Sequence, residues 1–254
     1  MPFLSITNQK GGVAKTTTSI HLAIAMAADH PDQKVLLVDL DSQQNATGVL
    51  SGNTEFSDTE TSFDLFSGQV LSSRHLHAYE NSNLYVVPAS LRLVEVETML
   101  AGQLDGFFRL KESLNKAKNE FSQIIFDCPP SLSMITINAL VCADYVLVPM
   151  QVSKFSLDGL HRILDSVSTV KKRYNPNLEI LGAVFSMHNE NTSLSRAMKP
   201  QVEKLMRIFN SAIPRSVVVE EAHLLKKNLF DYAPDSKPAK QFRKLAEEVQ
   251  HATK

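Results

Sequence analysis

The segment Asn8–Thr17 constrains the fold of this chain more than any other, because it sets glycine and lysine at a strand–helix junction. It reads Asn-Gln-Lys-Gly-Gly-Val-Ala-Lys-Thr-Thr, after the short apolar run Phe3–Thr7 and before the helical pattern of Thr16–Ala28. In such a loop, successive backbone N–H groups and the helix N-terminus together surround an anion. The sequence therefore predicts a phosphate-binding loop, and disfavours a strand–turn–helix connection that merely contains lysines.

Two lysines and one threonine of this loop are expected to bind the phosphates and the magnesium ion of a nucleotide. Lys15 is placed to reach the β- and γ-phosphates of a nucleoside triphosphate, and the Thr16 hydroxyl to ligate Mg²⁺. The strict pattern G-x-x-x-x-G-K-[ST] has glycines where this chain has Gln9 and Ala14. The segment instead fits a deviant form, K-G-G-x-x-K-T-[ST], in which Lys10 is an extra lysine at the start of the loop.

The alanine at position 14 is expected to affect the rate of nucleotide hydrolysis. If its position requires a left-handed backbone, alanine costs roughly 1–2 kcal/mol more than glycine there. Its methyl group also comes close to the phosphates. We therefore expect nucleotide binding to be retained and hydrolysis to be the step at risk.

Short apolar runs alternate with helical patterns along the whole chain, which predicts one doubly wound α/β domain over residues 1–254, its mostly parallel sheet flanked by helices. The expected strands are Phe3–Thr7, Lys34–Asp39, Leu84–Val87, Gln123–Asp127, Tyr145–Pro149 and Glu179–Phe185. The expected helices are Thr16–Ala28, Leu91–Leu100, Phe107–Asn119, Met134–Cys142, Leu157–Tyr174, Leu194–Phe209 and Ala239–His251. We expect the polar stretch Ser42–Glu60 to be a mobile loop, and Pro234–Pro238 to separate the last helix from the body.

Net charge, cysteine content and hydropathy together limit the kinds of protein that this chain can be. The chain has 254 residues and a formal net charge of −1, so binding to nucleic acid would need a local basic patch. The two cysteines, Cys128 and Cys142, fit a reducing, cytoplasmic compartment better than a disulfide framework. No apolar stretch approaches the length of a transmembrane helix.

Three aspartates follow apolar strands and are expected at the carboxyl edge of the sheet, where ligands bind in such folds. Asp39 and Asp41 end one strand, and Asp127 ends another. Hydrolysis of a nucleoside triphosphate needs a group that holds the metal and one that positions water. Asp127 suits the first role, through a Mg²⁺-bound water, and Asp41 the second. Taken singly, each acid is also compatible with a helix N-cap or a turn.

Together these motifs resemble the ParA/Soj family of deviant Walker A ATPases, which partition chromosomes and plasmids. The resemblance covers nearly the whole chain and keeps the family's order of motifs. The matching segments are Lys10–Thr17, Val38–Ala46, Phe126–Pro130, Asn138–Leu140, Leu157–Leu160, Ile213–Arg215, Glu221–Ala222 and Tyr232–Ser236. The resemblance implies a P-loop NTPase fold of the deviant Walker A type, with ATP and Mg²⁺ as cofactors.

The resemblance also implies a cycle of assembly and hydrolysis. ATP is bound between two subunits of a homodimer, and Lys10 crosses the interface to the partner's nucleotide. Such dimers bind DNA without sequence preference, in the cytoplasm and on the nucleoid, and a ParB-type partner stimulates their slow hydrolysis. The implied nucleotide-binding residues are Lys10, Gly11, Gly12, Val13, Ala14, Lys15, Thr16 and Thr17, with Met187, Pro214 and Ser216 against the adenine.

This chain departs from the family at several positions. The family usually has glycine at Ala14, proline at Ser42 and asparagine at Ser216, and it often has an arginine of the DNA-facing surface at Asn191. Phosphate contacts need positive charge on one face and no particular spacing, so nearby residues could offset that loss. The remaining candidates, each also compatible with an ordinary solvated helix face, are Arg196, Lys199, Lys204, Arg207, Arg215, Lys226 and Lys227.

Other kinds of site are disfavoured. His75 and His77 have no matching cluster of acids or cysteines, so no metal site beyond nucleotide-bound Mg²⁺ is expected. Cys128 follows the Walker B acid but has no second cysteine upstream, which argues against an iron–sulfur cluster. The last helix has two acids and two bases outside its apolar stripe, so packing on the sheet is favoured over a membrane surface.

The sequence thus predicts a ParA-like ATPase. Lys15, Lys10 and Mg²⁺ would stabilise the developing charge, Thr16 and Asp127 would hold the metal, and Asp41 would orient the water. One alternative is an ATP-binding switch that barely hydrolyses ATP and acts as a scaffold for a protein partner, which Ala14 and Asn191 favour. A second is a positioner of the same fold that serves a protein cluster or an envelope site.

Overall fold

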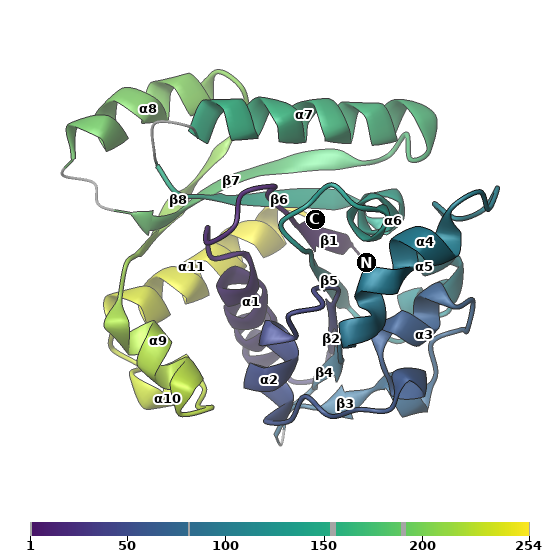
Figure 1. Cartoon of the computed structure of the whole chain (residues 1–254). Helices are drawn as coiled ribbons and strands as arrows, with labels where there is room; N and C mark the ends of the chain where they lie inside the picture. Colours follow the sequence, from purple (N-terminus) through teal and green to yellow (C-terminus); the bar gives the residue numbers. More distant parts are fainter. Residues whose placement is uncertain (1, 81, 153–155, 189–191, 254) are drawn as a thin grey trace.

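The computed structural model describes residues 2–80, 82–152, 156–188 and 192–253 (Figure 1). Within them an eight-stranded sheet runs in the order β3-β4-β2-β5-β1-β6-β7-β8. All neighbouring strands are parallel except β3, which is antiparallel to β4. This confirms the predicted doubly wound α/β fold. The strands are β1 (Phe3–Ile6), β2 (Val35–Asp39), β3 (His77–Ala78), β4 (Leu84–Val87), β5 (Gln123–Asp127), β6 (Tyr145–Met150), β7 (Glu179–His188) and β8 (Ile208–Pro214).

Helices cover both faces of the sheet (Figure 1). One face carries α3 (Ser62–Phe66), α4 (Val96–Leu100), α5 (Arg109–Ser113), α6 (Met134–Cys142), α7 (Ser156–Arg173) and α8 (Ser193–Glu203). The other carries α1 (Lys15–Asp29), α2 (Asn45–Ser51), α9 (Val217–Leu224), α10 (Leu229–Tyr232) and α11 (Lys237–Ala252).

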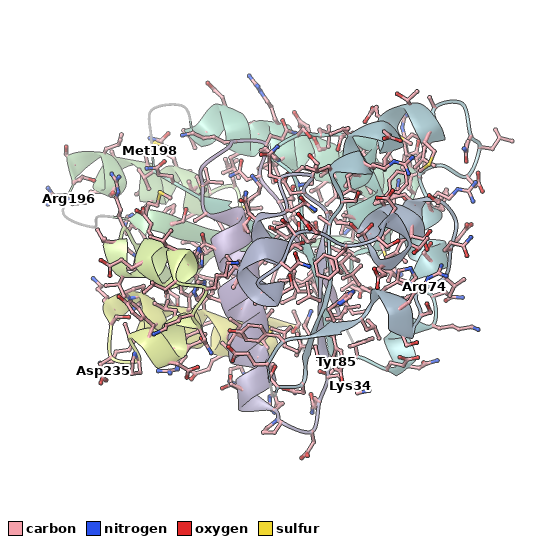
Figure 2. All side chains as sticks on the ribbon, turned by 60° about the horizontal axis from the view of Figure 1, so that its bottom comes forward. Lys34, Arg74, Tyr85, Arg196, Met198 and Asp235 are labelled. Atoms are coloured by element: carbon pink, nitrogen blue, oxygen red, sulfur yellow. The ribbon has the colours of Figure 1, made fainter. Side chains whose placement is uncertain are left out.

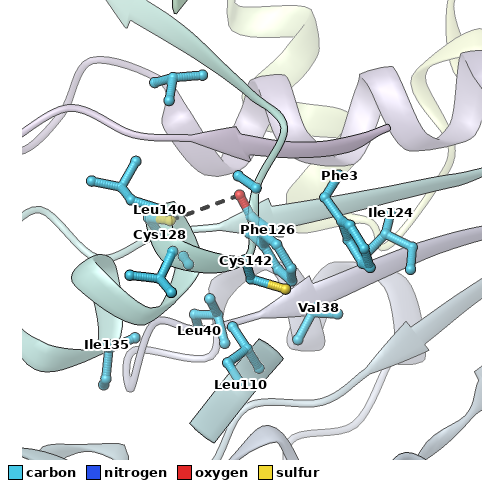
Figure 3. Packing of buried hydrophobic residues seen from close by; sticks show 14 of the residues in the cluster. Phe3, Val38, Leu40, Leu110, Ile124, Phe126, Cys128, Ile135, Leu140 and Cys142 are labelled. Atoms are coloured by element: carbon cyan, nitrogen blue, oxygen red, sulfur yellow. Dashed lines mark hydrogen bonds between the residues drawn. The ribbon is translucent and has the colours of Figure 1, made fainter. Parts of the chain in front are cut away.

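The central strands β1, β2 and β5 are mostly apolar because successive residues enter two different cores. Phe3, Val38 and Phe126 pack beneath α6 and its neighbours, in the cluster shown in Figure 3. The adjacent Leu4 and Ile125 pack beneath α1 and α11. Burial on both faces leaves little exposed but the strand ends, so polar residues at those ends have a reason other than solvation.

Helix α11 packs against α1 and β8, as its apolar stripe predicts. Phe242, Leu245, Ala246 and Val249 are fully buried there. The Phe242 ring stacks on the His21 ring of α1 with a centroid distance of 4.5 Å. In the described part of the chain, no helix is long and apolar enough to cross a membrane.

Two sequence predictions are wrong. The stretch Ser42–Glu60 is not a loop throughout, because it contains α2 and a 3-10 turn, Asp58–Glu60. The helix expected over Leu194–Phe209 ends at Glu203, and Ile208–Pro214 forms β8 beside β7. In β8, Phe209, Ser211 and Ile213 alternate inward, a period of two that the helical spacing upstream concealed.

The ends of three other predicted segments differ from the structure by smaller amounts. The helix expected over Phe107–Asn119 is only α5 and a 3-10 turn, Ala117–Asn119, and the one over Leu91–Leu100 begins as a 3-10 turn before α4. Pro238 lies in the first turn of α11 instead of before it, a place where a missing N–H costs no helical hydrogen bond.

Candidate nucleotide site

The loop between β1 and α1 is held by the strands beside it. The side chain of Asn8 donates to the Pro149 carbonyl of β6 at 2.8 Å and accepts the Lys10 N–H at 3.0 Å. The Ser186 hydroxyl of β7 donates to the Val13 carbonyl at 2.8 Å. Asn8 and the Val13 carbonyl thus fasten the loop to the neighbouring strands on its sheet side.

The open face of the loop has room for a phosphate chain. Gly12 has φ of 70°, in the left-handed region. A Cβ added at Gly11 or Gly12 would meet no atom within 4 Å. The glycine pair therefore leaves a cradle that side chains do not fill, as an anion-binding loop requires.

Ala14 ends this loop in a left-handed conformation, with φ of 61° and ψ of 36°. This is the condition under which alanine costs roughly 1–2 kcal/mol. The strain lies directly before the first turn of α1, where Lys15 and Thr16 begin the helix. Backbone strain is thus stored at the point where phosphate would bind.

Lys15 is turned into the protein, with only 7% of its surface exposed. Its ammonium donates to the Lys10 carbonyl at 3.3 Å. Burial lowers the pKa of Lys15, while the nearby charge of Asp127, Cys128 and Asp41 raises it. A cation so poorly solvated gains from a phosphate in the adjacent cradle.

Asp127 ends β5 next to Asp39 of β2 and is fully buried. The Ser19 hydroxyl donates to its Oδ1 at 2.9 Å. Its Oδ2 has no hydrogen-bond partner among the residues that the structure describes. Burial first, and then the charge of Asp39, raises the pKa of Asp127 well above its usual range, while Thr16 and Ser19 lower it.

These residues fit a magnesium ion. A buried carboxylate oxygen without a donor is costly, and a hard cation with oxygen ligands removes that cost. The Thr16 hydroxyl adjoins the same carboxylate. Thr16 and Asp127 thus supply oxygen donors beside the phosphate cradle.

Asp41 follows β2 and is 8% exposed. Its Oδ1 accepts the Gln43 N–H at 3.0 Å, and its own N–H donates to Asp39 Oδ1 at 3.1 Å. Its charge raises the pKa of Lys15. Asp41 therefore lies close enough to the ammonium of Lys15 to act beside the glycine cradle.

A second pocket, of about 70 Å³, opens beside the start of α1. Met187 reaches it from the end of β7 in a left-handed conformation, with φ of 49°. Pro214 and Ser216 reach it from the end of β8, and Ala14 and Thr17 from the loop and α1. The structure thus gathers all the residues predicted to lie against the adenine around one cavity next to the cradle.

Sequence reasoning missed four residues of this pocket. One is Ile213 of β8, and the other three are Val219, Glu220 and His223 of α9. The three residues of α9 share one face of the helix. They lie three, four and seven positions after Ser216, which caps α9, and this helical spacing would have found them.

The predicted DNA-contacting residues lie on several elements. Arg196 and Lys199 are exposed on α8, with Arg196 at the edge of the molecule in Figure 2. Arg215 lines the pocket above, and the Lys226 ammonium donates to the Gly52 carbonyl at 2.7 Å. The Arg207 guanidinium stacks over Phe209, while Lys204 and Lys227 are exposed. Asn191 lies outside the described residues.

Comparisons with known proteins agree with this geometry. Residues 1–180 match a family model described as an AAA domain. The chain is 37% identical over 249 residues to the sporulation initiation inhibitor protein Soj of Bacillus subtilis, covering 97% of each. It is 36% identical to the chromosome partitioning protein ParA of Caulobacter vibrioides, covering 97% of this chain and 92% of ParA.

Solved structures resemble the whole chain. Cobyrinic acid a,c-diamide synthase from Mycobacterium smegmatis with bound ADP and magnesium superposes with a TM-score of 0.80 at 30% identity, covering 97% of this chain and 93% of that one. Apo McdA from Cyanothece superposes with a TM-score of 0.85 at 26% identity, covering 100% of both chains.

Proposed function

Since this chain belongs to the ParA/Soj family of partitioning ATPases, we propose that it binds Mg·ATP at this site as a single ATPase domain over residues 1–254. ATP is hydrolysed slowly in a nucleotide-sandwich homodimer that acts in chromosome or plasmid partitioning. The observation that carries the proposal is Oδ2 of Asp127, which has no hydrogen-bond partner within the described ranges of the chain and lies beside the buried ammonium of Lys15 and the open glycine cradle.

Each predicted residue has a role in this proposal. The backbone of Gly11–Thr17 and the N-terminus of α1 cradle the phosphates. Lys15 in its own subunit, and Lys10 from the partner copy, balance the negative charge that develops on the transferred phosphoryl group. Thr16 and Asp127 hold Mg²⁺, which when bound neutralises charge on the phosphate oxygens. Asp41 orients the attacking water.

The adenine occupies the pocket beside α1 in this proposal. Met187 and Pro214 supply apolar contact, and Thr17 and Ser216 line the same pocket with hydroxyl groups. The pocket has a volume of only about 70 Å³, so the base is expected to displace flexible side chains such as Met187 on entry.

The ATP dimer is proposed to bind DNA without sequence preference and to work with a ParB-type protein, in the cytoplasm and on the nucleoid. The candidates for phosphate contact are Arg196, Lys199, Arg215, Lys226 and Lys227. All five are exposed. Arg196 and Lys199 lie on one helix, α8, while Lys226 is engaged with the Gly52 carbonyl.

The test is binding to random-sequence duplex DNA with Mg·ATP, Mg·ADP or no nucleotide, across a salt series. Binding only with Mg·ATP, with affinity falling steeply as salt rises, supports the proposal. Equal binding in all three states, or none while ATP affinity is normal, contradicts it. Arg196→Ala with Lys199→Ala should reduce the slope with salt, while leaving ATP affinity unchanged.

A second function is favoured by the left-handed Ala14. A strained alanine at the phosphate loop is compatible with an ATP-binding scaffold that barely hydrolyses ATP and positions a protein cargo. Normal ATP affinity with no hydrolysis, and with restored hydrolysis in Ala14→Gly, would favour this function over partitioning.

A further inference from the structure

Helix α2 is tied to the end of β2 by buried hydrogen bonds. Thr47 donates both its backbone N–H, at 2.8 Å, and its hydroxyl, at 2.7 Å, to Oδ2 of Asp39. Both residues are fully buried. A carboxylate that receives two donors from one residue fixes that residue's position and orientation.

The other oxygen of Asp39 reaches the proposed catalytic machinery. Asp39 Oδ1 accepts the N–H of Asp41 at 3.1 Å. One carboxylate thus holds α2 with one oxygen and the backbone of Asp41 with the other. The main chain at Asp41 is therefore located by Thr47, although Thr47 is remote from the phosphate loop in sequence.

The end of β4 completes the arrangement. The Thr47 hydroxyl accepts the Ala89 N–H at 2.9 Å, and the Gln44 side chain donates to the Ala89 carbonyl at 2.9 Å. Both backbone groups of Ala89 thus fasten the first turn of α2. The chain of contacts runs from β4 through Thr47 and Asp39 to Asp41.

We propose that Asp39 and Thr47 are positioning residues for hydrolysis, which act by fixing Asp41. The inference rests on the water-orienting role proposed for Asp41. Neither residue needs to touch the nucleotide. A carboxylate that orients water must hold its place closely, since a shift of about 1 Å at a reacting group costs about a hundredfold in rate.

The proposal separates hydrolysis from binding. Lys15 and the glycine cradle bind the phosphates and are held from β6 and β7 by Asn8 and Ser186. Loss of the Thr47 hydroxyl should therefore slow the chemical step without weakening ATP affinity. A merely structural role would lower the melting temperature and leave the rate of the folded protein unchanged.

The experiment compares three variants in single-turnover ATP hydrolysis, ATP affinity and thermal unfolding. Thr47→Val removes the hydroxyl at nearly constant shape, and should slow hydrolysis by about ten- to a hundredfold with unchanged ATP affinity. Thr47→Ser keeps the hydroxyl and should restore the rate. Ser51→Ala is the matched control, because Ser51 bonds the carbonyls of Thr47 and Asn53 at the far end of α2 and does not bond Asp39.

Asp39→Asn provides an independent variant should Thr47→Val not fold. Its amide keeps one acceptor oxygen but faces an N–H group toward either Thr47 or Asp41, so hydrolysis should again slow. The assay is run at saturating Mg²⁺, because the lost charge of Asp39 also acts on Asp127. A wild-type rate in either folded variant overturns the proposal, as does an equal loss in Ser51→Ala. A wild-type rate in Asp41→Ala would instead overturn the role of Asp41, so the two failures are distinguishable.

Discussion

The two ends of the nucleotide site are built differently. The phosphate end consists of buried charged groups, Lys15, Asp41 and Asp127. The Ser19 hydroxyl of α1 donates to Asp127, and the Gln43 N–H donates to Asp41. The base end is a cavity of about 70 Å³ that apolar side chains such as Met187, Pro214 and Val219 line together with polar ones. Electrostatics fixes the first end and packing the second, so substitutions at the phosphate end should have the larger effects.

The largest effect is expected for Lys15→Ala. It removes the buried cation that faces the phosphate cradle, so nucleotide-dependent dimerisation should be abolished. Light scattering with and without Mg·ATP measures this, with thermal unfolding as the control for folding. A variant that still dimerises with Mg·ATP would show that the phosphate end does not depend on this charge.

The next effect is expected for Asp41→Ala. Hydrolysis should fall by at least about a hundredfold while ATP still binds, and the protein should stay on DNA as a trapped ATP dimer. Hydrolysis assays and the dissociation rate from DNA after dilution test this. Rapid release with ATP still present would contradict the role given to Asp41.

A pH effect is expected from His21, next to the base end. Burial, as the largest cause, lowers the pKa of His21 to about 3, and its Nδ1 lies 2.7 Å from the Thr17 carbonyl. The unfolded chain binds a proton near pH 6.5 and the folded one does not. His21 therefore supports the fold above pH 6.5, and that support is lost as the pH falls toward 3.

The size of this loss is about 2 kcal/mol between pH 6.5 and pH 5. His21→Phe keeps a ring between Phe242 and His223 and removes the titration. Urea unfolding of both proteins at the two pH values should show a shallower decline in the variant. Parallel declines would mean that other groups carry the pH dependence.

The smallest effect is expected for Ala14→Gly, at the junction of the two ends. Glycine relieves the left-handed strain of roughly 1–2 kcal/mol but enlarges the conformational freedom of the unfolded chain. The free energy of unfolding should therefore rise by about 1 kcal/mol or less, as urea titration measures. A loss of stability would show that Ala14 makes packing contacts that outweigh its strain.

Sequence alone could propose residues for the phosphate end because their signals are local. Glycines, lysines and the acid at the end of an apolar strand act through the backbone on which they lie, and Lys15, Thr16 and Asp127 come together as expected. Asp39 was placed at the strand end, but its contact with Thr47 was not foreseen.

Regions that depend on distant partners escaped prediction. Helix α2 lies in a polar segment and is fastened by Asp39 and Ala89, which no periodicity reports. Strand β8 forms because it pairs with the edge of β7. Its alternating segment is too short to be recognised next to the helical pattern that precedes it. Helix α9 begins just after β8. Because β8 was not predicted, the residues of α9 that line the base end were not predicted either.

The most direct test of the account is the mass of the protein in sedimentation equilibrium with no nucleotide, with Mg·ADP and with Mg·ATP, measured for the wild type and Asp41→Ala. The account predicts a dimer with Mg·ATP, longer-lived in Asp41→Ala, and no such dimer with Mg·ADP. The same mass in all three states, with ATP binding verified in parallel, would contradict a nucleotide-gated sandwich.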